Sequence, residues 1–134
     1  MNLLTDSWIP VRDDSGFLQV RYQDLLCEEH DWQISLPRDD MEMGCLQLLV
    51  CLTQVMFMPQ DVKALRERIR TPLTFSEFEA GTKKYMDWFD LDHPETPFMQ
   101  IKNTQSKELT PIQKLFVGMP AGHNHAFFNN TEEI

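Results

Sequence analysis

The sequence is short of positive charge. Its 134 residues include 12 lysines and arginines against 21 aspartates and glutamates, which gives a formal net charge of -9. Free-standing, non-specific binding to nucleic acid requires a basic surface, so the composition argues against that class of function. The deficit is concentrated in residues 1–60, with ten acids and three bases, whereas residues 61–134 have eleven and nine. Any contact with a polyanion is therefore expected from the second half.

Cysteines and the sequence signatures of common enzymes are also scarce. The three cysteines are an odd number and show no C-x-x-C spacing of the kind found in metal sites. The chain has no G-x-S-x-G motif, no phosphate-cradling glycine loop and no visible Cys–His pairing. Its first ten residues lack the basic start and the long apolar stretch of a signal peptide. These absences favour a cytoplasmic, non-enzymatic protein without a cofactor or a metal ion.

One apolar run dominates what is present. No charged residue occurs between Glu42 and Asp61. Asp39 and Glu42 have the spacing at which side chains cap a helix start and favour its positive dipole end. Pro59 cannot continue a helix, and it disfavours helical backbone in the residue before it. We therefore predict a helix over residues 39–57.

Apolar side chains occur on nearly every side of this predicted helix. Such a helix is buried on most sides, either in a protein core or in a membrane. A membrane span needs ~20 mostly apolar residues. The run here is barely that long, and it contains Gln47, Thr53 and Gln54. The prediction is a central helix buried in a protein core.

Weaker signals complete an α+β fold in which a β-hairpin, short strands and further amphipathic helices pack around the central helix. The hairpin spans residues 2–22, with turn formers at 13–16. Val62, Leu65 and Ile69 share one face of a surface helix expected to lie against the central one. The remaining predictions are a short helix at 23–29, a strand at 32–35, a helix that the pair Thr74 and Glu77 caps, a loop at 90–97, a strand at 98–101 and a helix that Thr110 caps and Gly118 ends.

Two groups of residues resemble chemical sites. Arg66, Arg68 and Arg70 suggest a phosphate-binding stripe, but alternate positions fan around a helix, so a solvated charged face is the preferred interpretation. His123 and His125 have the spacing of two metal ligands, but no third ligand is near them in sequence, and Zn²⁺ takes three or four. A hydrogen-bonding or surface role is preferred, and a metal-dependent hydrolase is the least favoured alternative.

A loop near the C-terminus is the one suggestive feature. Phe127 and Phe128 stand beside Asn129 and Asn130 in a segment that contains glycine and proline. Aromatic faces suit base stacking, and amides suit hydrogen bonds to base edges. The alternative is that one phenylalanine anchors the loop in the core. The residues alone leave both readings open.

Five stretches occur in the order found in one known family. They are N-L-L-T-D-S-W-I-P-V (2–11), S-L-P-R-D-D-M-E (35–42) with the apolar helix after it, P-F-M-Q (97–100), L-T-P-I-Q-K-L (109–115) and A-F-F-N (126–129). With these stretches the chain resembles the N-terminal part of CasA, the large subunit of the type I-E CRISPR surveillance complex Cascade. The resemblance covers almost the whole chain.

The resemblance implies a non-catalytic subunit of an RNA-guided antiviral defence complex. Members of the family sit at the foot of Cascade, contact the 5′ handle of the CRISPR RNA, recognise the motif that flanks the target in double-stranded DNA, and help to recruit the helicase-nuclease. By the match, Phe127 would stack on or wedge against a handle base, and Asn129 would make a polar contact. Phe128 stands where the family often has an aliphatic residue. The run 35–42 would be scaffold.

CasA proteins are several times longer than this chain. The resemblance implies that residues 1–134 are the N-terminal portion of a CasA-like large-subunit domain, without the C-terminal four-helix bundle and without the residues that read the flanking motif. Duplex recognition by this polypeptide alone is therefore not expected. The alternative function is a stand-alone regulator or decoy that competes with full-length CasA for its docking site on Cascade.

Overall fold

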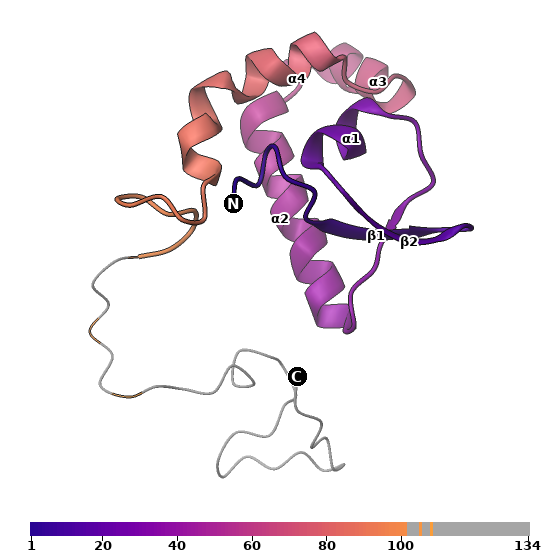
Figure 1. Cartoon of the computed structure of the whole chain (residues 1–134). Helices are drawn as coiled ribbons and strands as arrows, with labels where there is room; N and C mark the ends of the chain where they lie inside the picture. The colour runs from indigo at the N-terminus through magenta and orange to yellow at the C-terminus, as the bar shows by residue number, and fades with distance from the viewer. Residues whose placement is uncertain (102–104, 106–107, 109–134) are drawn as a thin grey trace. The chain divides into compact units, whose positions relative to one another are not determined.

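The computed structural model describes residues 1–101, 105 and 108. Met1–Ile101 form the first of two units, and the second, Lys102–Ile134, contains only two of the described residues. The elements are β1 (Ile9–Asp13), β2 (Gly16–Val20), α1 (Tyr22–Cys27), β3 (Gln33–Ile34), α2 (Asp39–Phe57), α3 (Val62–Arg70), α4 (Phe75–Thr82) and the 3-10 helix η1 (Lys83–Phe89) (Figure 1). A small antiparallel sheet with several helices confirms the predicted α+β class.

The sheet contains three short strands in the order β2-β1-β3. β1 pairs with β2 from Ile9 opposite Val20 to Asp13 opposite Gly16, which confirms the predicted hairpin. Its strands are shorter than the predicted span of 2–22, because residues 3–6 turn before β1 and Tyr22 begins α1. Gly16 has a φ of 129°, a backbone conformation that glycine adopts without strain. The Asp13 carboxylate accepts a hydrogen bond from the Ser15 amide at 2.9 Å and so holds the turn. Strand β3 adds two residue pairs on the other edge of β1.

Helix α1 connects the hairpin to the other helices. Before it, the Arg21 guanidinium donates hydrogen bonds of 3.0 and 2.6 Å to the Asp24 carboxylate. These bonds hold the pKa of Asp24 below its ordinary value. The buried Tyr22 ring packs beside Phe78 of α4, and its hydroxyl lies 2.7 Å from Thr53 Oγ1 of α2. Tyr22 therefore contacts both α2 and α4.

Helix α2 has the predicted bounds, but its first turn differs from the predicted cap. Arg38, rather than Asp39, occupies the N-cap position in an extended conformation, without a side-chain cap bond. Glu42 accepts a hydrogen bond from the Leu36 amide at 3.1 Å. The prediction of Asp39 as the cap is wrong because the chain before the helix folds back over the first turn, where the Glu42 carboxylate reaches Leu36.

The buried core combines residues from most of the elements. Its members are Leu3, Leu4, Ile9, Val11, Val20, Tyr22, Leu49, Leu73, Phe78 and Phe89. These side chains come from the N-terminal segment, β1, β2, α1, α2, α4, η1 and the segment before α4, so the core joins residues far apart in sequence. Leu49 is the one residue that α2 places in this buried set of described residues.

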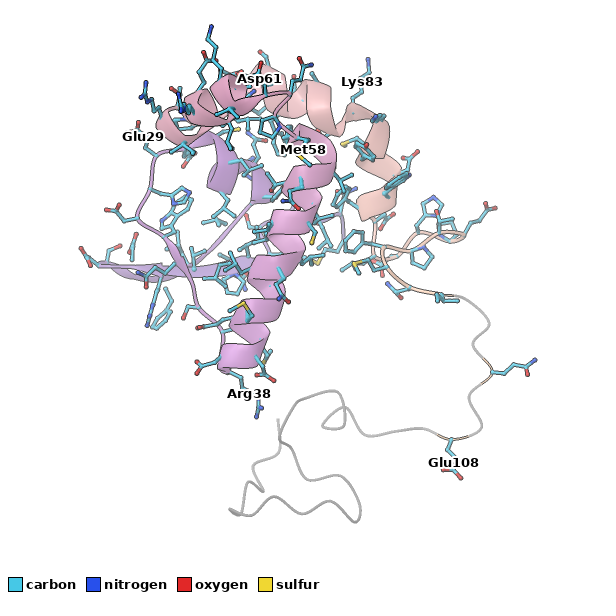
Figure 2. All side chains as sticks on the ribbon, turned by 180° about the vertical axis from the view of Figure 1, so that it is seen from behind. Glu29, Arg38, Met58, Asp61, Lys83 and Glu108 are labelled. Carbon is cyan, nitrogen blue, oxygen red and sulfur yellow. The ribbon has the colours of Figure 1, made fainter. Side chains whose placement is uncertain are left out.

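Burial of α2 is one-sided, contrary to the prediction of a helix covered on most sides. Met43, Leu46 and Val50 expose 55%, 47% and 45% of their surface. Strand β3 and helix α4 pack on the helix, and its outer side is open in the view of Figure 2. Within the described part of the chain, α2 is also the one helix long and apolar enough to cross a membrane by length and composition, a test that core helices pass too.

Helix α3 also differs from the prediction in its burial. Asp61 caps it by accepting a hydrogen bond from the Ala64 amide at 2.8 Å. Its apolar residues Val62, Leu65 and Ile69, predicted to lie against α2, expose 65%, 46% and 78%. Val62 and Leu65 border an open groove beside α2 and do not close onto that helix.

Helix α4 begins as predicted. The Thr74 hydroxyl accepts a hydrogen bond from the Glu77 amide at 3.2 Å, which confirms this capping pair. Gly81 has a packing role in this helix. A Cβ atom at this position would overlap the ring of Phe57. Glycine therefore allows the C-terminal end of α2 to approach α4 closely.

Residues 98–101, predicted as a strand, begin in a turn. Phe98 donates its amide hydrogen to the Asp90 carbonyl at 2.9 Å, and its ring stacks on Phe89. The Gln100 side chain donates to the Leu91 carbonyl at 3.0 Å. The segment therefore bonds back onto the loop before it, and no neighbouring strand is available within the described residues. The prediction of a loop at 90–97 is confirmed.

Candidate interaction surfaces

The residues predicted to contact RNA, Phe127, Phe128 and Asn129, lie outside the described residues. His123 and His125 lie outside them as well. Their roles stay predictions. Residues 1–101 show two other kinds of surface, a charged face on α3 and apolar hollows along α2.

The three arginines of α3 do not act as one row. All three are exposed. Arg68 forms an ion pair with Glu77 of α4, and this hydrogen-bonded partner lowers the pKa of the Glu77 carboxyl group. An arginine already paired with a carboxylate is less available to a phosphate group. The solvated charged face, preferred from the sequence, agrees with this arrangement.

Two described histidines support loops. The His30 ring stacks on Trp32, with ring centroids 4.3 Å apart, and its Nε2 lies 2.8 Å from the Leu25 carbonyl oxygen. His93 Nδ1 accepts a hydrogen bond from the Thr96 amide at 2.9 Å. Across residues 1–101, 105 and 108, no group of three or more His, Cys, Asp or Glu side chains is placed to hold a metal ion. The contacts of both rings are those of loop-stabilising residues.

An apolar groove of about 720 Å³ runs along α2 from its first turn to Gln54. Leu25 and Leu26 of α1 form one wall, and Trp32 and Ile34 extend that wall toward the sheet. The α2 side of the groove is made of Met43, Leu46, Leu49, Val50 and Thr53. Charge is confined to one end, where Asp39 and Glu42 lie in the first turn of the helix.

A second section, of about 690 Å³, continues the groove toward α3. The two sections share Leu25, Leu26, Thr53 and Gln54, so they form one continuous depression, here called the α2 groove. Phe57, Met58, Val62, Leu65 and Leu73 line the second section. Sequence reasoning missed this groove, although its signal was present in a helix with apolar residues on all sides and an adjacent helix with an apolar face.

A third hollow, of about 450 Å³, is lined by the other flank of α2 together with η1 and the following loop. Leu52, Val55 and Met56 contribute from α2. Trp88 and Met99, both largely exposed, stand opposite. Apolar surface is therefore open on both flanks of the helix. Such surface is suited to binding protein, since it offers shape and area but few groups for chemistry.

Comparisons with known proteins give this fold a family. Residues 2–133 match the family model of CRISPR-associated protein Cse1. A curated relative, CRISPR-associated protein CasA/Cse1 of Thermus thermophilus, is 26% identical over 137 residues, which cover 98% of this chain and 27% of the relative. The chain thus spans about a quarter of the length of that protein.

Solved structures agree with the sequence match. Thermus thermophilus CasA (Cse1) superposes with a TM-score of 0.71 at 24% identity, over 86% of this chain and 26% of that one. Thermobifida fusca Cse1 gives a TM-score of 0.62 at 25% identity, over 75% and 20%. The expected resemblance to CasA is confirmed. Because the family model matches nearly every residue, this chain belongs to the family of CRISPR-associated protein Cse1.

Proposed function

We propose that this chain acts as a non-catalytic component of a cytoplasmic, RNA-guided CRISPR defence complex of the Cascade type. The observation that carries the proposal is the match to the Cse1 family over residues 2–133. In RNA-guided systems, base pairing reads the target sequence while protein reads nucleic-acid shape and a short flanking motif. A subunit of this kind works by binding, so its function depends on the surfaces that contact RNA and the other subunits.

The proposed RNA contact is the segment that contains Phe127, Phe128 and Asn129. Residues 1–101 contain eighteen acidic and nine basic side chains, whereas residues 102–134 contain three of each. The excess negative charge of the first unit opposes binding through phosphates. Contact with the 5′ handle is therefore expected to use bases, with Phe127 stacking on one of them and Asn129 bonding to an edge.

Stacking of this kind has a measurable size. Replacing an aromatic residue that stacks on a base costs ~1–3 kcal/mol of binding, which is roughly a 5- to 150-fold increase in Kd. Phe127→Ala is expected to weaken docking by a factor in this range. Thermal stability is expected to stay unchanged, because a side chain that contacts RNA does not support the core. A large loss of stability would instead assign Phe127 to the core.

The deciding experiment is a titration of the chain onto a Cascade assembly that lacks its large subunit but carries CRISPR RNA. Saturable binding that Phe127→Ala weakens would support the proposal. Phe17→Ala is the matched control, since Phe17 is 81% exposed in the hairpin and has no proposed role in binding. Absence of binding, or an equal loss with both variants, would refute it.

Salt dependence gives a second check. Contacts through phosphates release counterions and weaken steeply with salt, whereas stacking on bases does not. Docking of this chain should therefore depend weakly on salt, and the isolated chain should bind random duplex DNA poorly. Flanking-motif recognition and helicase-nuclease recruitment are proposed only for the assembled complex. Competition against full-length CasA then separates a productive subunit from a decoy, because a decoy displaces CasA without restoring target binding.

A further inference from the structure

The outer face of α2 and the α2 groove form a large open apolar surface. We propose that this surface is the docking site for polypeptide from the remaining part of the Cse1 fold, whether that polypeptide is continuous with this chain or supplied by another. The inference rests on membership of the family. It does not depend on the proposed RNA contact.

The apolar character of the surface follows from one line of residues. Met43, Leu46 and Val50 lie at i, i+3 and i+7, so they share a face of the helix, and about half of each side chain is exposed. No charge interrupts α2 between Glu42 and Asp61. A helix that is apolar on all sides is normally buried. In residues 1–101, however, side chains cover only one side of it.

The shape of the surface suits an inserted segment. The α2 groove extends along the helix from Trp32 and Ile34 at one end to Val62 and Leu65 at the other. In Figure 2, α2 lies in front of the sheet, from Arg38 to Met58, with its outer side toward the viewer. Grooves lined in this way bind apolar faces of helices in many complexes.

Polar groups on the outer face specify the partner further. Gln47 and Gln54 are exposed there, and both are uncharged. Burying an amide is costly unless it forms hydrogen bonds. The partner segment is therefore apolar but provides hydrogen-bonding groups opposite these two side chains.

Charges at the ends of the groove discriminate between occupants. Asp39 and Glu42 border one end, and Asp61 borders the other, where Arg68 also lies. Two copies of the chain would bring together units that each have nine more acidic than basic side chains. An anionic membrane would meet the same repulsion. These charges favour a polypeptide with neutral or basic residues at its ends.

Length identifies the source of that polypeptide. The match covers 98% of this chain but only 27% of the Thermus thermophilus relative, so about three quarters of that relative's length lies outside it. Longer chains bury a larger fraction of their surface. A surface that is apolar and left open by residues 1–101 is where the remaining polypeptide would pack.

The test places this chain in a protein of full family length. A chimera is made in which the chain replaces the matched region of Thermus thermophilus CasA, and thiol alkylation is followed by mass spectrometry. Cys51 is exposed and next to Val50 on α2, so it reports on the outer face. Cys51 is expected to react quickly in the isolated chain and about tenfold more slowly in the chimera. Equal rates would overturn the proposal.

The variant Leu46→Lys with Val50→Lys tests the surface itself. It should restore fast labelling of Cys51 in the chimera while leaving the melting temperature of the isolated chain unchanged, because both side chains are already half exposed. Phe17→Lys, at an even more exposed apolar position in the hairpin, is the control and should change neither. An equal loss of stability in the isolated chain and the chimera would assign Leu46 and Val50 to the core and overturn the proposal.

A chimera that does not fold is replaced by mixing the isolated chain with Thermus thermophilus CasA that lacks its matched region. Slower labelling of Cys51 then supports the proposal, and unchanged labelling overturns it. Two other results would overturn the proposal if Leu46→Lys with Val50→Lys abolished them. Concentration-dependent dimers of the isolated chain would assign the surface to a second copy, and binding to phosphatidylcholine vesicles would assign it to a membrane. No RNA is present, so this result is independent of the proposed RNA contact.

Discussion

The hydrogen bond between Tyr22 and Thr53 supports a prediction in which the two partners have unequal effects. The Thr53 hydroxyl donates to the Leu49 carbonyl at 2.7 Å, so its single hydrogen is already used. Tyr22 is therefore the donor in the 2.7 Å contact between the two hydroxyls. Tyr22→Phe removes the donor and leaves Thr53 still bonded to Leu49, whereas Thr53→Val leaves the buried Tyr22 hydroxyl without this acceptor.

These two losses have different magnitudes. A net hydrogen bond is worth ~0.5–1.5 kcal/mol, whereas leaving a buried polar group unpaired costs ~1–3 kcal/mol. We expect Tyr22→Phe to lower the free energy of unfolding by about 1 kcal/mol and Thr53→Val by about 2 kcal/mol. The double variant should cost less than the sum of the two, because no hydroxyl is then left unpaired.

Urea unfolding followed by circular dichroism measures these differences, provided that the slope with denaturant is the same for all variants. A change of 1 kcal/mol also shifts the melting temperature by ~4–8 °C in a domain of this size. A Thr53→Val variant that is more stable than Tyr22→Phe would refute the reasoning. So would additive costs in the double variant.

The buried side chain of Tyr22 also predicts how the stability of the protein depends on pH. Burial raises the pKa of Tyr22 to about 12, from an ordinary value of about 10 in the unfolded chain. A raised pKa in the folded state stabilises the protein below the unfolded pKa, and this contribution is lost as pH rises from about 10 to about 12. The stability advantage of the wild type over Tyr22→Phe should therefore shrink above about pH 10. A constant difference across that range would contradict the burial of Tyr22.

Three further predictions concern single positions. Gly81→Ala should destabilise the protein by ~1–3 kcal/mol because its Cβ would overlap the Phe57 ring. The control Gly44→Ala places a Cβ that meets no atom within 4 Å and should stabilise by up to about 1 kcal/mol. Equal effects of the two variants in thermal melts would contradict the packing of Gly81 against Phe57. Leu49→Asp should abolish folding by placing an unpaired charge in the core, and a folded variant by circular dichroism would show that α2 is misplaced. Asp24→Asn should make stability fall less steeply below about pH 4. The lowered pKa of the Asp24 carboxyl group stabilises the folded state above that pH, and this contribution is lost below it. An unchanged dependence of stability on acid pH would count against the ion pair between Arg21 and Asp24.

Local signals predicted several elements correctly because the interactions that form them are local. The bounds of α2 follow from the acids that precede the apolar run and from Pro59, which cannot continue a helix. The hairpin follows from its turn, where Gly16 adopts a positive φ. The capping of α4 follows from Thr74 and Glu77, three residues apart. In each case the determining groups lie within a few residues of one another.

Other features depend on how a short stretch of chain folds back on itself, six or eight residues away. Asp39 is of a residue type that often caps helices, but the chain before α2 folds back so that the Leu36 amide donates a hydrogen bond to Glu42. The segment at 98–101 alternates like a strand, but Phe98 bonds back to Asp90. Sequence patterns do not include these partners, because they are set by where the chain returns in space.

The sequence by itself determined the α+β class and the length of α2, and its five motifs indicated the family that the match over residues 2–133 then confirmed. It also predicted Phe127, Phe128 and Asn129 as an RNA contact, which lies outside the described residues and stays a proposal. Only the tertiary structure decided which side of α2 is covered. The sequence shows that Leu46 and Leu49 are both apolar, but it does not show which of them is covered. Leu49 is buried and Leu46 is half exposed because β3 and α4 pack on one side of the helix and leave the other side open.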